Sequence, residues 1–151
     1  MDIWTLSEKA DFIANKQQCL LEQWRKYNNT LTQVITLSKA KLYQTINCDP
    51  GDGMRFFLFN YFVIHIRLAV DFNSHAIEYV LEQRGESNKV LIASAIMDCE
   101  VRIDDIIDNG NHEQVLEHYL GLIRPVYDNI YQSIDENTPL SLPLFQLNAV
   151  V

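Results

Sequence analysis

The stretch Arg55–Ala69, RFFLFNYFVIHIRLA, decides how this chain folds. Five of the seven residues from 56 to 62 are aromatic, and the second half places apolar residues on one face and His65 and Arg67 on the other. Aromatic and β-branched residues with a period of two are typical of a strand that packs one face on a core. We therefore predict a central β-strand, with a bulge near Asn60 because the stretch exceeds the usual strand length.

Two further strands are predicted after this stretch. His75–Gln83 alternates apolar with polar residues, and Leu91–Ile103 carries an apolar residue at every odd position. The segments between the strands are rich in turn-forming residues. Three consecutive strands joined by short loops predict a three-stranded antiparallel meander with one solvent-exposed face.

The first 49 residues contain no glycine or proline, which permits a long helix. Apolar residues recur there at alternating steps of three and four, and they form a stripe of nearly heptad period: Leu6, Ala10, Ile13, Leu20, Trp24, Tyr27, Leu31 and Val34. This pattern predicts helix over residues 5–47, starting at a capping box of Thr5 and Glu8. Weak helix formers around Asn28 leave a helical hairpin as the alternative.

A C-terminal helix is predicted after Asn111, which can act as its N-cap, and Pro125 is expected to kink it. The predicted fold is therefore α+β: a long N-terminal helix or helical hairpin, the three-stranded meander and a C-terminal helix. These elements form a single domain at residues 1–137, and residues 138–151 form a tail that contains two prolines and no charged side chain.

Composition limits the kinds of partner. The net charge is −8, and residues 50–151 hold six basic and fifteen acidic side chains. DNA-binding domains usually present a basic face, so this balance disfavours direct binding to nucleic acid. The longest apolar stretch is too short and too polar to cross a membrane. The N-terminus has no signal-peptide pattern, so the cytoplasm is the expected location.

No arrangement of residues predicts catalysis, a metal site or a cofactor site. Cys19, Cys48 and Cys99 are far apart in the sequence and form no metal-binding pair. His112 and His118 are six residues apart, whereas a helical zinc site needs a spacing of four. Glycine-rich phosphate loops and nucleophile motifs are absent from the sequence. We therefore expect a protein that is not an enzyme and has no catalytic, metal or cofactor-binding residues.

Several segments together resemble one family. They occur in order along nearly the whole chain: Ile3-Trp4, Ser7–Ala10, Gln23-Trp24, Ile35–Ala40, Phe72–Tyr79, Glu113–Leu120 and Val126–Asp128. In this combination the chain is similar to the formate hydrogenlyase regulatory proteins of the HycA family. The resemblance implies a negative regulator that opposes a formate-responsive transcriptional activator and lowers expression of the formate hydrogenlyase and hydrogenase-maturation operons. It implies no catalytic residues.

The expected mechanism is contact with the activator protein, because the chain is acidic and the predicted helical stripe is longer than a three-stranded sheet can cover. The partner of the helix is either the activator or a second copy of the chain. The candidate partner-binding residues are Trp24, Tyr27, Leu31, Lys39 and Lys41. Two alternatives remain open: a small repressor that binds promoter DNA, and a sensor that binds formate or another anion near Arg67 or His75.

Overall fold

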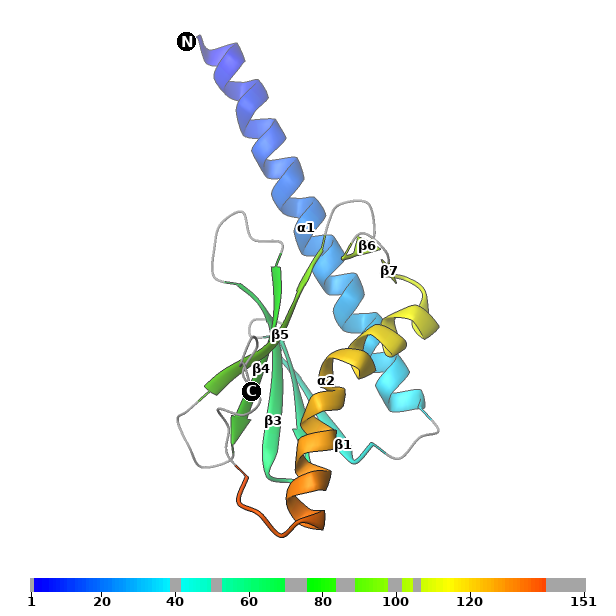
Figure 1. The fold of residues 1–151 in the computed structure, drawn as a ribbon. Coiled ribbons are helices and arrows are strands. Elements are labelled where there is room, and N and C mark those ends of the chain that lie inside the picture. The colour runs from blue at the N-terminus through cyan, green and yellow to red at the C-terminus, as the bar shows by residue number, and fades with distance from the viewer. Residues whose placement is uncertain are drawn as a thin grey trace.

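The structure, a computed structural model, describes residues 2–38, 42–49, 53–69, 76–83, 89–97, 102–104 and 107–140 (Figure 1). Two helices cover one face of an antiparallel sheet, and the N-terminal helix extends far beyond that sheet. The helices are α1 (Ile3–Leu37) and α2 (His112–Asp135). The strands are β1 (Gln44–Asp49), β2 (Gly53–Leu58), β3 (Phe62–Leu68), β4 (Ala76–Gln83), β5 (Lys89–Ile96), β6 (Arg102–Ile103) and β7 (Ile107–Asp108).

The main sheet has five strands, so the prediction of a three-stranded meander is wrong. Strands β1 to β5 lie side by side in sequence order, and every neighbouring pair is antiparallel. The α+β class and the two terminal helices are as expected, but two strands were missed. One is β1, which occupies sequence predicted to be helical, and the other arises because the central stretch folds into two strands.

The central stretch turns at the position where a bulge was predicted. Phe59 and Asn60 have φ angles of 52° and 56°, and the Tyr61 amide donates to the Leu58 carbonyl at 3.0 Å. Two consecutive residues with positive φ form the turn of a tight hairpin. Glycine, the usual sequence signal for this turn, is absent here. The stretch was therefore predicted to form one long strand. The hairpin places β2 and β3 side by side in the centre of the sheet.

Helix α1 is continuous, so the helical hairpin is ruled out. Its N-cap is Asp2, whose Oδ1 accepts from the Thr5 amide at 2.8 Å, rather than the predicted Thr5. The helix passes through Asn28, whose side chain donates to the Trp24 carbonyl inside the helix at 2.6 Å. It ends at Leu37, ten residues before the predicted end, and the chain then enters β1 after Tyr43, a residue with a φ of 56°.

The register of β5 differs from the predicted alternation. The β4–β5 register shifts between Tyr79 and Val80, where β5 carries one extra residue, Ile92. Ala93 and Ala95 therefore point into the core, whereas Leu91 pairs with Val80 on the other face. The strand ends at Ile96, and β6 and β7 form a separate two-stranded sheet rather than its continuation.

The core lies between one face of the sheet and the two helices. The C-terminal third of α1 contributes Tyr27, Leu31 and Val34, and α2 contributes Tyr119 and Ile123. Asn111 caps α2 as predicted, with its Oδ1 accepting from the Gln114 amide at 3.1 Å. Pro125 lies inside α2. Neither described helix contains a stretch that is long and apolar enough to cross a membrane.

A buried pair of tyrosines joins α1 to the middle of the sheet. The hydroxyl groups of Tyr27 and Tyr79 lie 2.5 Å apart, and both residues are completely buried. Burial raises the pKa of both phenols well above their usual value, so both remain neutral. Because a buried hydroxyl without a partner is costly, this pair specifies how the helix sits on the sheet.

Gly53 is the first residue of β2, and its backbone tolerates no side chain. Its φ is 87°, and an added Cβ would lie 2.2 Å from the backbone oxygen of Ile66 on β3. We expect Gly53→Ala to lower the free energy of unfolding by about 2–4 kcal/mol, measured by urea denaturation. Gly121→Ala is the control because nothing lies within 4 Å of the added carbon. It should stabilise α2 by about 0.5–1 kcal/mol. Equal effects of the two substitutions would contradict this account of how closely the start of β2 lies against β3.

Candidate interaction surfaces

The predicted partner-binding residues lie in different environments. Tyr27 and Leu31 are completely buried in the core, where a partner cannot reach them. Trp24 is half-buried and stacks on Tyr27 with a ring-centroid distance of 6.2 Å. Lys39 and Lys41 lie outside the described residues. The stripe therefore packs on the sheet in the C-terminal part of α1, and its exposed part lies nearer the N-terminus.

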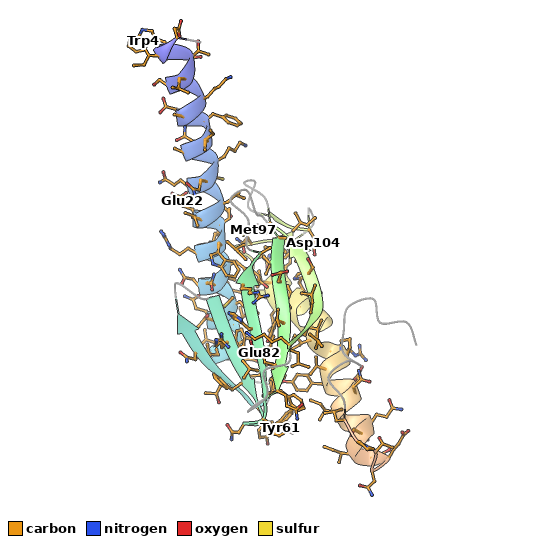
Figure 2. All side chains as sticks on the ribbon, turned by 90° about the vertical axis from the view of Figure 1, so that its left-hand side faces the viewer. Trp4, Glu22, Tyr61, Glu82, Met97 and Asp104 are labelled. Carbon is orange, nitrogen blue, oxygen red and sulfur yellow. The ribbon has the colours of Figure 1, made fainter. Side chains whose placement is uncertain are left out.

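The first exposed surface is the N-terminal part of α1, residues 3–22, which we call the projecting segment. Figures 1 and 2 show this segment extending away from the sheet, with Trp4 near its tip and Glu22 close to where it meets the domain. Its large apolar side chains are exposed to solvent: Ile3, Trp4, Leu6, Phe12, Ile13 and Leu21. A surface helix normally turns such residues toward a core, so the segment presents an unusually exposed apolar surface.

The second exposed surface is built from three aromatic residues that come from different elements. Tyr43 precedes β1 and stacks on Phe59 of the β2–β3 turn at a centroid distance of 6.0 Å. Phe59 also packs against Tyr127 of α2 at 5.8 Å. Tyr43 is 67% exposed and Phe59 is 45% exposed, and both have a left-handed backbone. Left-handed bulky residues are strained, so the fold holds exposed aromatic rings here at a cost in stability.

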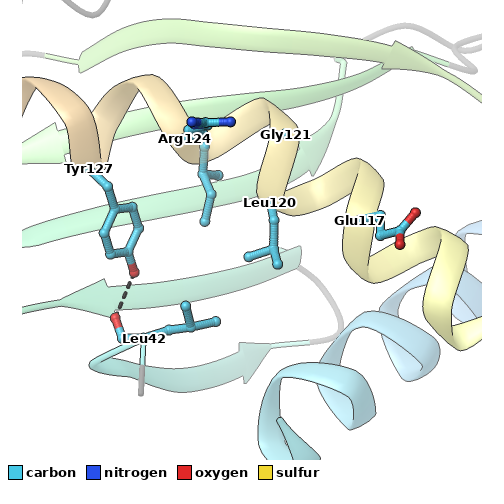
Figure 3. A pocket seen from close by; sticks show the side chains of 7 residues that line it. Leu42, Glu117, Leu120, Gly121, Arg124 and Tyr127 are labelled. Carbon is cyan, nitrogen blue, oxygen red and sulfur yellow. Dashed lines mark hydrogen bonds between the residues drawn. The ribbon is translucent and has the colours of Figure 1, made fainter. Parts of the chain in front are cut away.

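A groove adjoins these rings between α2 and the residues before β1 (Figure 3). Its volume is about 410 Å³, and Leu42, Leu120 and Ile123 form its apolar walls. Glu117 and Arg124 also line it and bring one charge of each sign. We call the groove together with Tyr43, Phe59 and Tyr127 the aromatic groove.

Hydrogen bonds fix the end of the aromatic groove nearest β1. The Tyr127 hydroxyl donates to the Leu42 carbonyl at 2.6 Å (Figure 3). It also accepts from the side-chain amide nitrogen of Gln44 at 2.9 Å. The Gln44 oxygen accepts from the buried Tyr119 hydroxyl at 3.1 Å. Burial raises the pKa of Tyr127, so the phenol stays neutral and keeps its proton for the Leu42 carbonyl. These hydrogen bonds hold the side chain of Tyr127 in the wall of the groove.

Charged side chains pair with one another on the sheet face opposite the helices. Glu82 lies 3.0 Å from Arg55 and 3.1 Å from Lys89, and the His65 ring lies 4.0 Å away (Figure 2 labels Glu82). Arg67, one residue considered for an anion site, pairs with Glu78 at 3.3 Å. His75, the other one, lies outside the described residues. Because the glutamates already neutralise these cations, the cluster has little capacity to attract formate.

The acidic and histidine residues near the start of α2 form structural contacts. The His118 Nε2 lies 3.0 Å from an Asp104 carboxylate oxygen. Buried Asn109 donates to the Gln23 carbonyl of α1 at 2.9 Å, which ties the β7–α2 connection to α1. Within the described ranges, no three histidine, cysteine or acidic side chains are grouped so that they could hold a metal ion.

Sequence reasoning missed the aromatic groove because its parts are distant along the chain. Tyr43 was assigned to a helix and Phe59 to the middle of a strand. An aromatic side chain in the middle of a strand is expected to lie in the core. The local signal was the run of aromatic residues around Phe59, which contains more bulky rings than a single strand can bury on one face.

The two tryptophans of α1 provide a test of where the core ends. Trp24 packs against the core, whereas Trp4 is 76% exposed. We expect Trp24→Ala to lower the free energy of unfolding by about 1–3 kcal/mol because packing on Tyr27 is lost. Trp4→Ala should change it by less than about 0.5 kcal/mol. Urea denaturation measures both, and an unchanged stability of the Trp24 variant would show that α1 is less firmly packed than described.

Comparison with known proteins places the chain in a family. A sequence profile described as transcriptional repressor of hyc and hyp operons matches residues 1–146. The formate hydrogenlyase regulatory protein HycA of Escherichia coli K12 is 45% identical over 142 residues, 94% of this chain and 93% of the relative. HycA proteins of Escherichia coli O157:H7 and Shigella flexneri match equally. No solved structure matches significantly. The resemblance noted in the sequence is thus confirmed, and the chain belongs to the HycA family of transcriptional repressors of the hyc and hyp operons.

Proposed function

We propose that this protein lowers expression of the formate hydrogenlyase and hydrogenase-maturation genes by binding a formate-responsive transcriptional activator through the aromatic groove. Membership in a family of transcriptional repressors supports the regulatory role. The observation that supports the protein contact is the pair of strained, exposed aromatic rings of Tyr43 and Phe59 beside an apolar groove. Aromatic side chains next to a pocket are typical of the residues that dominate binding energy in protein interfaces.

The charge of the molecule favours a protein partner over DNA. The net charge is −8, so the molecule as a whole repels phosphates. On the sheet, Arg55 and Lys89 are paired with Glu82, and Arg67 is paired with Glu78. Cations that are already neutralised release few counterions from DNA and add little affinity.

The shape of the aromatic groove indicates what it would accept. An apolar or aromatic side chain of the activator would enter between Leu42 and Leu120 and lie against the ring of Tyr127. Glu117 and Arg124 would orient polar groups of the partner. Because hydrogen bonds already hold Tyr127, binding would need little reorganisation of this wall.

Titration of the labelled protein with the purified activator, and separately with promoter DNA, tests the proposal. Both titrations use near-physiological ionic strength because low salt exaggerates binding to DNA. The expected result is saturable binding to the activator and none to the DNA. Binding to promoter DNA alone would contradict the proposal and favour the direct-repressor alternative.

A double substitution locates the contact. Asparagine tolerates a left-handed backbone, so Tyr43→Asn/Phe59→Asn removes both rings without new strain. We expect activator affinity to fall at least about tenfold, measured in the same titration, while the urea midpoint shows a folded protein. Phe12→Asp is the control because Phe12 is also an exposed aromatic residue, at 64%, but lies on the projecting segment. Equal losses in both variants would contradict the assignment to the groove.

A further inference from the structure

We infer that a polar pocket between α1 and the start of α2 binds a small anion that carries a phosphate group. The pocket has a volume of about 430 Å³, and one face of α1 lines it together with Gly110 and His112 (Figure 1 shows the start of α2 beside α1). It shares no lining residue with the aromatic groove, and its ligand is tested without the activator. The inference therefore stands or falls independently of the proposed function.

Two cations in the pocket have no carboxylate partner. Arg25 and Lys26 both line it, and neither lies within ion-pair distance of an acidic side chain in the part of the chain that the structure describes. The cations of the sheet differ in this respect, because Glu78 and Glu82 pair with them. In a chain with a net charge of −8, two unpaired cations in a concave site form a local region that attracts an anion.

The acidic side chains nearest the pocket have other hydrogen-bond partners. Glu22, the acid among the lining residues, accepts from the side-chain amide of Gln18, which lies one turn nearer the N-terminus, at 3.2 Å. Asp108 accepts from the Gly110 amide at 2.9 Å. A Cβ added at Gly110 would lie 3.1 Å from the Lys26 Nζ, so this glycine leaves room for the amine beside the start of α2. Both cations are therefore available to a ligand.

Thr30 is the residue that distinguishes this pocket from an ordinary solvated surface. It lines the pocket although only 6% of it is exposed, and its hydroxyl has no hydrogen-bond partner among the described residues. A threonine inside a helix can bond the carbonyl one turn back, as Thr36 does with the Thr32 carbonyl at 2.7 Å. A nearly buried hydroxyl without a partner is costly, and a hydrogen bond to a ligand oxygen would remove that cost.

The donors around the pocket match the oxygens of a phosphate group. Helix α2 begins at His112, and Asn111 caps the amide of Gln114, so the amides before it have no partner inside the helix. Guanidinium, ammonium, hydroxyl and helix N-terminal amide groups are the usual partners of phosphate oxygens. Here they approach from two helices, as a tetrahedral anion requires. The pocket is larger than a bare phosphate, and the side-chain amides of Asn29 and Gln33 can bond a polar organic part.

Titration of the isotope-labelled protein with ribose 5-phosphate, followed by amide chemical shifts, tests the inference. Sodium chloride at matched ionic strength is the reference because salt alone screens surface charges. We expect saturable shifts at Thr30, Gly110 and His112, with a dissociation constant of about 0.01–1 mM. Inorganic phosphate should shift the same amides, and equal affinity for the two probes would assign the site to free phosphate. No saturation by either probe up to about 50 mM would overturn the inference.

Two substitutions separate specific binding from a general attraction to a lysine on the helix. Lys26→Met should raise the dissociation constant for ribose 5-phosphate at least about tenfold, and Thr30→Val, which keeps the shape of the side chain, about threefold. Lys16→Met is the matched control because Lys16 is another exposed lysine of α1 that does not line the pocket. Equal losses in the two lysine variants would overturn the inference. Shifts of the same amides by a short DNA duplex, with none from either small phosphate, would also overturn it.

Discussion

The structure depends on one rigid element that is fixed at only one end. Helix α1 has 35 residues, which corresponds to about 52 Å, and the buried contacts begin at Trp24 and Tyr27. The hydrogen-bonded hydroxyls of Tyr27 and Tyr79 hold this end on the middle of the sheet. Since the helix is continuous through Asn28, its remaining length must leave the domain in a direction that the core determines. The projecting segment is therefore a consequence of how the core is packed.

The same small core explains why aromatic rings remain at the surface. The sheet has one face covered by helices, and Phe56, Tyr79 and Tyr119 already fill the space between them. The tight β2–β3 turn leaves Phe59 outside that space, and the left-handed Tyr43 turns the chain from α1 into β1 beside it. Both turns use residues that are strained in these conformations. The fold therefore keeps these aromatic rings at the surface at a cost in stability.

Much of the fold follows from local patterns. Heptad-like spacing predicts α1, the Asn111 cap marks the start of α2, and the period of two identifies β3 and β4. The errors share one physical cause, since turns were expected at glycine and proline. The chain turns at Tyr43 and at Phe59-Asn60 instead, so one strand was read as helix and two strands as one. Trp24, Tyr27 and Leu31 were inferred to bind a partner from helical periodicity, which cannot distinguish the buried Tyr27 from the exposed Ile13 on the same stripe.

The division of α1 into an anchored part and a projecting part is most directly tested by hydrogen exchange in dilute solution. The account predicts that amides from Tyr27 to Ile35 are strongly protected because they lie in the core. Amides of residues 3–22 should exchange much faster because the sheet lies beside only the lower part of α1. Equal protection along the whole helix would contradict the account.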